Sequence, residues 1–218
     1  MSVDDTGALT LAGADGFKLG VAKASIPKGL PGSEQKWLLP LEVVEAFVSI
    51  AAKQHGDVLV QLDDRRVSLM WEDLTEIVSV LVQGTFVRYQ QVIAETNLLS
   101  FTVDTAQLIK QCQLAMLSVT YGLPGIRLTF TPETNRLQVH HHNNEAAYDG
   151  EMDVTDWKTD KVSGPQHITL NQGALVASLR AAGETATLSW DTPSTPVKIV
   201  SSDQSFLAVI MPISLGVE

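Results

Sequence analysis

The segment HITLNQGALVASLRAAGETATLSW, residues 167–190, contains the pattern that decides the fold. Residues His167 to Leu170 alternate in polarity, which is typical of a β-strand. Asn171 is a preferred helix N-cap, and Gly183 is expected to end the helix. The apolar residues between them recur at helical spacing: Leu175, Val176, Leu179 and Ala182. Thr187 to Trp190 returns to a strand pattern, so the segment predicts strand, helix and strand.

The strand–helix–strand order occurs again nearer the N-terminus. Two more strands follow the first segment, at Val197 to Val200 and Phe206 to Met211. The earlier copy begins with a strand at Trp37 to Leu39, and Pro40 suits the first turn of the next helix. The predicted helical stripe is Val43, Val44, Phe47, Val48 and Ala51, with Gly56 expected to end the helix. The strands expected after it are 58–62, 67–71 and 77–82. The two copies begin far apart, at Trp37 and His167, and such a long spacing favours duplicated units over a solenoid.

A third segment lies between these two copies. It opens with a strand at Leu99 to Val103, and Asp104 is its expected helix N-cap. The helical stripe is Leu108, Ile109, Cys112, Ala115 and Met116, and the predicted strands after it are 126–130 and 137–140. Ala94 to Asn97 is interpreted as a linker. Together the three segments predict an α+β protein with antiparallel sheets and helices packed on one face.

The N-terminal region departs from this order. Before Trp37 only two stretches, Ala8 to Ala12 and Phe17 to Ala24, have strand character. If the second and third segments form one complete domain, residues 1–95 contain a domain that lacks its opening strand, helix and strand.

Composition restricts the class of protein. The 218 residues are 44% hydrophobic, and no apolar run reaches the ~20 residues that cross a bilayer. The acidic start has no signal-peptide pattern, and the single cysteine, Cys112, excludes an internal disulfide, so we expect a cytoplasmic protein. The net charge is −10 and the fifteen basic residues are scattered, so the sequence shows no basic patch for nucleic acid. Only the folded chain could assemble one.

Three adjacent histidines, His140 to His142, raise a zinc hypothesis. On a strand only the outer two share a face, and apart from Glu145 no Cys, Asp or Glu lies nearby with ligand spacing. We therefore favour a solvated strand end and expect no metal and no cofactor.

Nothing in the sequence argues for catalysis. Cys112 lies on an apolar helical stripe, which favours a buried structural thiol. The acidic pairs at 63–64 and 72–73 are interpreted as turn residues. Gly13 and Gly16 do not open a helix, so they do not form a phosphate-binding loop, and no Gly-x-Ser-x-Gly motif is present.

The C-terminus carries unusual apolar residues. Phe206 to Ile210 predicts a central strand, which Pro212 should prevent from continuing. Ile213 and Leu215 then lie near the end of the chain, where they need cover from this chain or a partner.

These residues and several motifs resemble the bacterial sliding clamps, the β subunits of DNA polymerase III. The family ends in a Val-Met-Pro-Met-Arg-Leu type sequence, and this chain has Ile-Met-Pro-Ile-Ser-Leu at 210–215. The family's Ala-Thr-Asp-Gly-His-Arg-Leu resembles residues 13–19, and its Gly-Arg-Phe-Pro-Asp-Tyr resembles residues 84–89. Its Phe-Asn helix start resembles Leu170-Asn171, and its Asn-Asn-Pro-Glu turn resembles residues 143–145. These motifs occur in the family's order along nearly the whole chain.

The resemblance implies a sliding-clamp fold with two helices in each complete domain. Residues 1–95 would be an incomplete middle domain, and 96–218 the complete C-terminal domain. The implied function is that of a processivity factor, or part of one, which tethers replication and repair proteins to DNA and has no catalytic residues of its own. The alternative is a clamp-derived peptide-binding module that does not encircle DNA.

The family's partner pocket lies on the last domain and at its junction with the middle one. It binds short linear peptides from DNA polymerase, clamp loader and repair proteins. Carried over by motif, the pocket comprises Gly16, Phe17, Lys18, Leu19, Pro40, Val44, Phe86, Asn171, Ser194, Pro196, Val209, Ile210, Met211, Pro212, Ile213 and Leu215. Phe17 replaces the family histidine, Ser214 its arginine and Ala174 its usual aromatic, so peptide specificity is expected to differ.

The family's helices face duplex DNA and make weak, non-specific phosphate contacts. The polar residues available here for that role are Lys53, Gln107, Lys110, Gln111 and Arg180. Glu42 and Glu45 oppose it, and the resemblance leaves a homo-oligomeric ring open.

Overall fold

The computed structural model describes residues 1–4, 6–26, 35–93, 98–117, 125–142, 146–159 and 164–213. The chain divides into two compact units. The N-terminal unit comprises Met1–Leu11 and Ala24–Arg88, and the C-terminal unit comprises Ala12–Lys23 and Tyr89–Glu218. The predicted linker at 94–97, the turn at 143–145 and residues 214–218, with Leu215 among them, lie outside the described residues.

Two antiparallel sheets form most of the C-terminal unit. The first runs in the order β12-β8-β14-β15-β16-β3. Its strands are β12 (Thr155–Thr159), β8 (Leu99–Asp104), β14 (Thr185–Trp190), β15 (Val197–Ser201), β16 (Phe206–Ile210) and β3 (Lys18–Ser25). The second runs in the order β11-β10-β9-β13. Its strands are β11 (Ala147–Asp153), β10 (Arg136–His142), β9 (Gly125–Thr131) and β13 (Gln166–Asn171).

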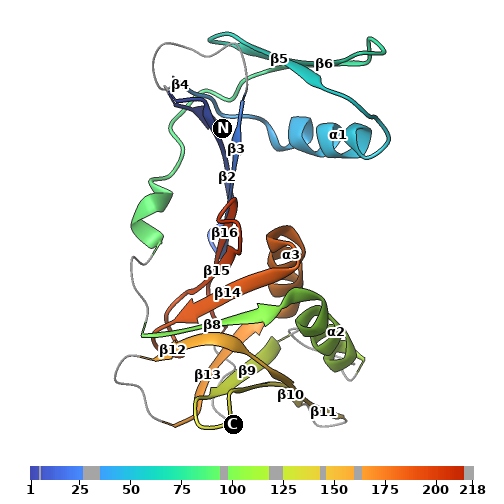
Figure 1. Ribbon diagram of the computed structural model, residues 1–218. Coiled ribbons are helices and arrows are strands. Elements are labelled where there is room, and N and C mark those ends of the chain that lie inside the picture. The colour runs from blue at the N-terminus through green and yellow to red at the C-terminus, as the bar shows by residue number, and fades with distance from the viewer. Residues whose placement is uncertain are drawn as a thin grey trace. The chain divides into compact units, whose positions relative to one another are not determined.

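Two capped helices connect these sheets. The Asp104 carboxylate accepts a hydrogen bond of 2.7 Å from the backbone N of Gln107 at the start of α2 (Thr105–Met116). The Asn171 side chain accepts one of 3.0 Å from the backbone N of Ala174 at the start of α3 (Gln172–Ala182). Both N-caps were predicted and are confirmed. The helices pack against each other, with α2 also on β10 and β11 and α3 on β15 and β16 (Figure 1).

One apolar core unites both sheets and both helices. Phe101 stacks on Phe130 with ring centroids 4.8 Å apart, and Trp190 meets Phe101 edge-on at 5.4 Å. The predicted stripes of both helices are buried or packed against this core. Cys112 is fully buried among them, and desolvation raises its pKa to about 12. The predicted structural thiol is therefore confirmed, and the α+β fold class is also as expected.

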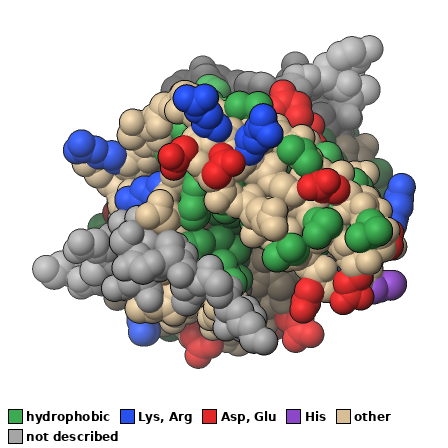
Figure 2. Space-filling view, turned by 90° about the horizontal axis from the view of Figure 1, so that it is seen from above, with side chains coloured by type: hydrophobic (Ala, Val, Ile, Leu, Met, Phe, Trp, Pro, Cys, Tyr) green, Lys and Arg blue, Asp and Glu red, His purple; other side chains and the backbone are tan. Residues whose placement is uncertain are grey.

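The N-terminal unit has a smaller core under α1 (Leu41–Ala51). The strands β5 (Val58–Leu62), β6 (Arg66–Trp71) and β7 (Glu76–Val80) form a three-stranded antiparallel sheet, while β1 (Ser2–Val3) pairs with β2 (Ala8–Ala14) and β4 (Gln35–Lys36). The helical stripe was predicted wrongly in part, because Val44 is 40% and Val48 60% exposed. The α1 residues that pack inward are Val43, Phe47, Ile50 and Ala51. Apolar side chains remain at the surface among charged ones in Figure 2.

Other differences from the sequence prediction involve element boundaries and edge strands. The predicted strand at Trp37 to Leu39 reduces to a single bridge from Leu38 to Val82, and α1 ends at Ala51 rather than close to Gly56. β11 and β12 were not predicted. β11 reads AYDGEMD, and its polar residues obscure the alternation because only Met152 in it is buried.

Candidate docking surface

The surface is built where β16 meets β3. These strands pair antiparallel, with Val209 opposite Leu19 and Ile210 opposite Lys18. Val209 also lies opposite Lys198 of β15. Because directly paired residues share a sheet face, Leu19, Val209 and Lys198 form one row across three strands. The row combines a buried apolar centre with a cationic side chain at one end.

The turn before β3 presents an exposed aromatic ring. The Asp15 carboxylate accepts hydrogen bonds of 3.0 Å from the backbone N atoms of Phe17 and Lys18, and these bonds hold its pKa below the ordinary value. Gly16 has φ +88°, which suits glycine. The turn is thus fixed by its backbone, while the Phe17 side chain is 77% exposed. Such a ring is available to a partner at little cost to the fold.

The chain beyond β16 is held by two backbone bonds. The N–H of Met211 donates to the carbonyl of Phe17 at 2.8 Å, so the exposed turn and the end of β16 are adjacent. After Pro212, the N–H of Ile213 donates to the carbonyl of Thr169 in β13 at 2.9 Å. The predicted end of the strand before Pro212 is confirmed. Met211 is 42% exposed and therefore offers apolar surface beside Phe17.

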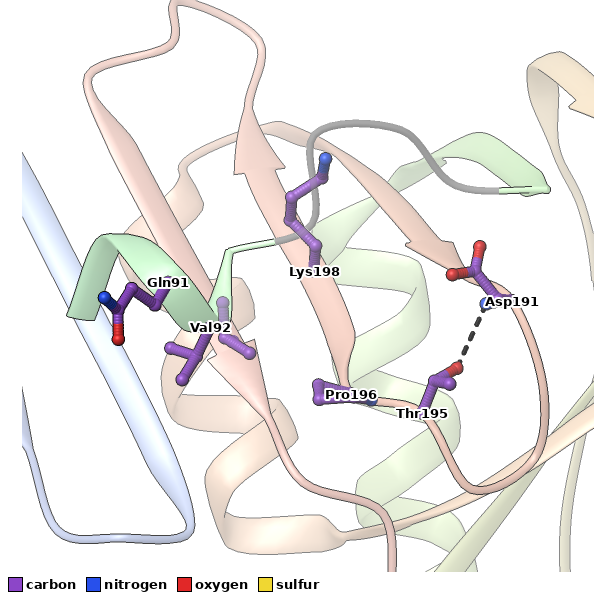
Figure 3. A pocket seen from close by; sticks show the side chains of 7 residues that line it. Gln91, Val92, Asp191, Thr195, Pro196 and Lys198 are labelled. Carbon is purple, nitrogen blue, oxygen red and sulfur yellow. Dashed lines mark hydrogen bonds between the residues drawn. The ribbon is translucent and has the colours of Figure 1, made fainter. Parts of the chain in front are cut away.

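A hollow of about 240 Å³ opens next to the row. Its walls come from the short helix η1 (Tyr89–Val92), the loop after β14, and strands β15 and β16. Figure 3 shows Gln91 and Val92 on one side and Asp191 and Thr195 on the other, with Lys198 between them. The remaining lining residues are Pro196 and Val209. The hollow is smaller than a typical drug-sized cavity and suits one or two side chains.

Apolar packing fixes the base of the hollow, and hydrogen bonds fix one of its walls. Val209 belongs to a buried cluster with Leu19 and Val21, against which Tyr89 and Ile93 pack. In the wall, the Thr195 hydroxyl accepts bonds from the backbone N–H groups of Asp191 at 3.2 Å and Thr192 at 2.9 Å. The Asp191 carboxylate accepts the N–H of Leu98 at 2.7 Å. A pre-formed cavity with an apolar base and a few polar groups is what peptide anchor side chains require.

No family model and no curated protein matches this chain. Solved structures do match it. A solved structure from Eubacterium rectale, assigned as a DNA polymerase III β subunit, superposes on this chain with a TM-score of 0.87. The two sequences are 15% identical, and the match covers 98% of this chain and 56% of that one. The subunit from Pseudomonas aeruginosa gives 0.82 at 20% identity over 98% and 57%. The one from Thermotoga maritima gives 0.81 at 22% over 97% and 56%.

The chain has the sliding-clamp fold. It spans little more than half the length of the solved clamps that it matches, from 56% to 57% in these three. Identities of 15% to 22% establish the fold alone. No helix among the described residues is long and apolar enough to cross a membrane.

Several residues that the clamp resemblance selected come together in the C-terminal unit. Phe17 and Met211 are joined by a backbone bond, Leu19 and Val209 pack together, and Pro196 lines the hollow with Val209. Gly16, Lys18, Ser194, Pro212 and Ile213 stay predictions. Ile210 also stays a prediction, although it is buried in the main core of the C-terminal unit, on the sheet face opposite Val209. Asn171 uses its side-chain oxygen to cap α3. Pro40, Val44 and Phe86 belong to the N-terminal unit and stay predictions, and Leu215 lies outside the described residues.

Sequence reasoning missed five residues of the hollow: Gln91, Val92, Asp191, Thr195 and Lys198. The available signal was the run Asp-Thr-Pro-Ser-Thr-Pro at 191–196, whose Thr and Pro residues suit a tight, rigid connection between strands. Lys198 is revealed only by the strand register that sets it opposite Val209.

The residues predicted to face DNA fall into two groups, four with exposed side chains and one whose side chain is hydrogen-bonded within the fold. Gln107 and Lys110 on α2, Arg180 on α3 and Lys53 after α1 are exposed. Gln111 is engaged within the fold, because its amide accepts the Tyr148 hydroxyl and donates to the carbonyl of Glu151. All five remain predictions, and the basic charge on these helices is small.

Proposed function

We propose that this chain is a sliding clamp, or part of one, that tethers DNA polymerase, clamp loader or repair proteins through short peptides. The observation that carries the proposal is the docking surface just described, on a sliding-clamp fold. There, exposed Phe17 and Met211 lie side by side at the end of β16, in the same unit as a hollow that includes Val209. The role is non-enzymatic, and we place it in the cytoplasm.

The chemistry of the surface specifies the ligand. An extended peptide with apolar anchor residues could insert one into the hollow and cover the exposed faces of Met211 and Phe17. Methionine adapts its shape to different apolar partners, which suits a surface that serves several proteins. Lys198 offers a charge-assisted hydrogen bond to a peptide carbonyl or carboxylate. One solved clamp from Pseudomonas aeruginosa, 19% identical to this chain, is described as bound to griselimycin.

The domain assignment is part of the proposal. Residues 96–218 would be the complete C-terminal clamp domain, since they contain both capped helices and the large common core. Residues 1–95 would be an incomplete middle domain. The predicted contributions of Pro40, Val44 and Phe86 depend on this assignment.

Peptide binding tests the proposal directly. The probe is a fluorescein-labelled peptide carrying the clamp-binding segment of a bacterial DNA polymerase, followed by fluorescence anisotropy. Met211→Ala should weaken binding by about 1–3 kcal/mol, the usual range for an anchor contact. Phe86→Ala should do the same if the N-terminal unit contributes. Leu117→Ala is the control, because Leu117 is 84% exposed but follows α2, which does not line the hollow. Equal affinity in wild type, Met211→Ala and Phe86→Ala would reject the pocket.

A module that binds peptides without encircling DNA is the second candidate. The net charge of −10 favours it, because long-range repulsion opposes phosphate binding. For this chain alone we expect weak, non-specific duplex binding that falls steeply as salt rises. Retention on circular plasmid at high salt, with release when the plasmid is linearised, would instead demonstrate a topologically closed ring of several copies. Loss of all binding at high salt on both forms would support the module.

A further inference from the structure

The hairpin of β10 and β11 brings three metal-ligating side chains together. Its register sets His140 directly opposite Asp149, while His142 lies two residues farther along β10 and so on the same face. His141 faces the other way, where it is buried and its Nδ1 contacts the carbonyl of Gly125 at 2.8 Å. Asp149 is seven residues beyond His142 in the chain and is brought to it only by the strand pairing.

The donor atoms converge on one point. Oδ1 of Asp149 is 2.5 Å from Nδ1 of His140 and 2.9 Å from Nε2 of His142. All three donor atoms lie within 4.8 Å of one another. Among the residues that the structure describes, these three form the only such group of His, Cys, Asp or Glu side chains. The two rings are tilted by 55° with centroids 6.1 Å apart, and one nitrogen of each ring contacts the same carboxylate oxygen of Asp149.

We propose that His140, His142 and Asp149 bind a divalent transition-metal ion, with zinc as the reference ion. Two imidazoles and one carboxylate are donors that Zn²⁺ accepts, and three protein ligands leave a fourth position for water. Imidazole donors also favour Cu²⁺ and Ni²⁺ over Mg²⁺ or Ca²⁺, which prefer oxygen ligands. The site is separate from the docking surface and does not depend on the proposed function.

The present spacing needs only side-chain movements to accept the ion. Ligands at about 2.0–2.1 Å around a tetrahedral zinc are roughly 3.3 Å from each other. The carboxylate must therefore withdraw slightly from each imidazole while the two nitrogens approach. The side chains of Asp149 and His142 are 57% and 58% exposed and can rotate, whereas that of His140 is 23% exposed and acts as the anchor. No backbone change is required.

Charged neighbours on the same sheet face set the affinity. Arg127 of β9 pairs with His140 from the other side, so its guanidinium opposes a second cation. Glu151 of β11 shares the face of Asp149 but is engaged by Arg136 at 2.8 Å. Removing the Arg127 charge should therefore tighten zinc binding, which a purely hydrogen-bonded cluster does not predict.

Zinc alone is the probe, titrated into the full chain at neutral pH against a chromophoric chelator. We expect one zinc per chain, and at least about tenfold weaker binding in both His142→Ala and Asp149→Asn. His55→Ala is the matched control, because His55 is an exposed histidine of the N-terminal unit. The zinc affinity of this variant should equal that of wild type. Arg127→Gln should bind more tightly than wild type.

Hydrogen exchange gives a second readout. A metal that bridges β10 and β11 would hold the edge strand β11 against its neighbour and reduce its local opening. Zinc should therefore slow amide exchange in β11 in wild type and not in His142→Ala. Absence of saturable binding up to the solubility limit of zinc would overturn the site. Equal zinc affinity in wild type, His142→Ala and Asp149→Asn would also overturn it, because the ion would then be bound elsewhere.

Discussion

Replacing Phe17 with alanine tests whether a peptide covers the turn before β3. A phenylalanine side chain presents about 150–250 Å² of surface. At 77% exposure, roughly 150 Å² of Phe17 remains open to solvent. If a bound peptide covers half of it, about 75 Å² is removed from water, equivalent to about 2 kcal/mol at 25 cal/mol per Å². That corresponds to a Kd about 25-fold higher in Phe17→Ala.

The assay is fluorescence anisotropy with the labelled polymerase peptide, combined with urea unfolding of each variant. Unfolding should be almost unchanged, because the turn is held by backbone bonds to Asp15 rather than by the ring. Leu117→Ala again serves as the exposed apolar control. If Phe17→Ala binds as tightly as wild type while Met211→Ala binds weakly, the peptide does not cross the turn and the reasoning is refuted.

Three further predictions concern the fold. Gly16→Ala should lower the free energy of unfolding by about 1 kcal/mol in urea titrations, because alanine is strained at φ +88°; an unchanged midpoint would show that the turn relaxes. Hydrogen bonds from the Ser201 hydroxyl and then from Ser205 lower the Asp203 pKa from 3.8 to about 2, so the stability they add is present above pH 3.8 and is lost as pH falls towards 2. Asp203→Asn should thus have a lower free energy of unfolding than wild type at neutral pH, and this difference should shrink as the pH falls from 3.8 towards 2. A difference that stays constant over this pH range in urea titrations would contradict the prediction. Cys112, with its pKa raised to about 12, should resist alkylation by iodoacetamide in the native state and react on unfolding, as mass spectrometry would detect; rapid native labelling would contradict its burial.

Local patterns predicted the capped helices and most strands of the C-terminal unit. Asp104 and Asn171 were recognisable because an N-cap acts on backbone only three residues away. The stripe of α1 was misjudged because Val44 and Val48 fit helical spacing, while burial depends on which neighbours cover each side. β11 and β12 were missed for a related reason: edge strands are largely exposed, so polar residues replace the alternation that marks a strand.

The candidate sites were likewise predicted from the sequence only in part. Motif order selected Leu19, Pro196, Val209 and Met211 by resemblance, but not the other five residues that line the hollow. Lys198 joins them through strand register, and the short helix η1 joins through packing of its Tyr89, and of Ile93 just after it, on the buried cluster. His140 and His142 were visible in the sequence as a pair on one face, without their partner Asp149.

The sequence by itself determined the three helices, most strands and their order, the N-caps of α2 and α3 and the apolar end of the last strand. These features depend on interactions over a few residues, which periodicity and residue type record directly. The tertiary structure alone decided that Met211 lies beside Phe17 and that Asp149 lies between two histidines. Both depend on the register of paired strands, where a shift of one residue would turn every side chain to the opposite face. Register is fixed by the packing of the whole core, so no short stretch of sequence contains it.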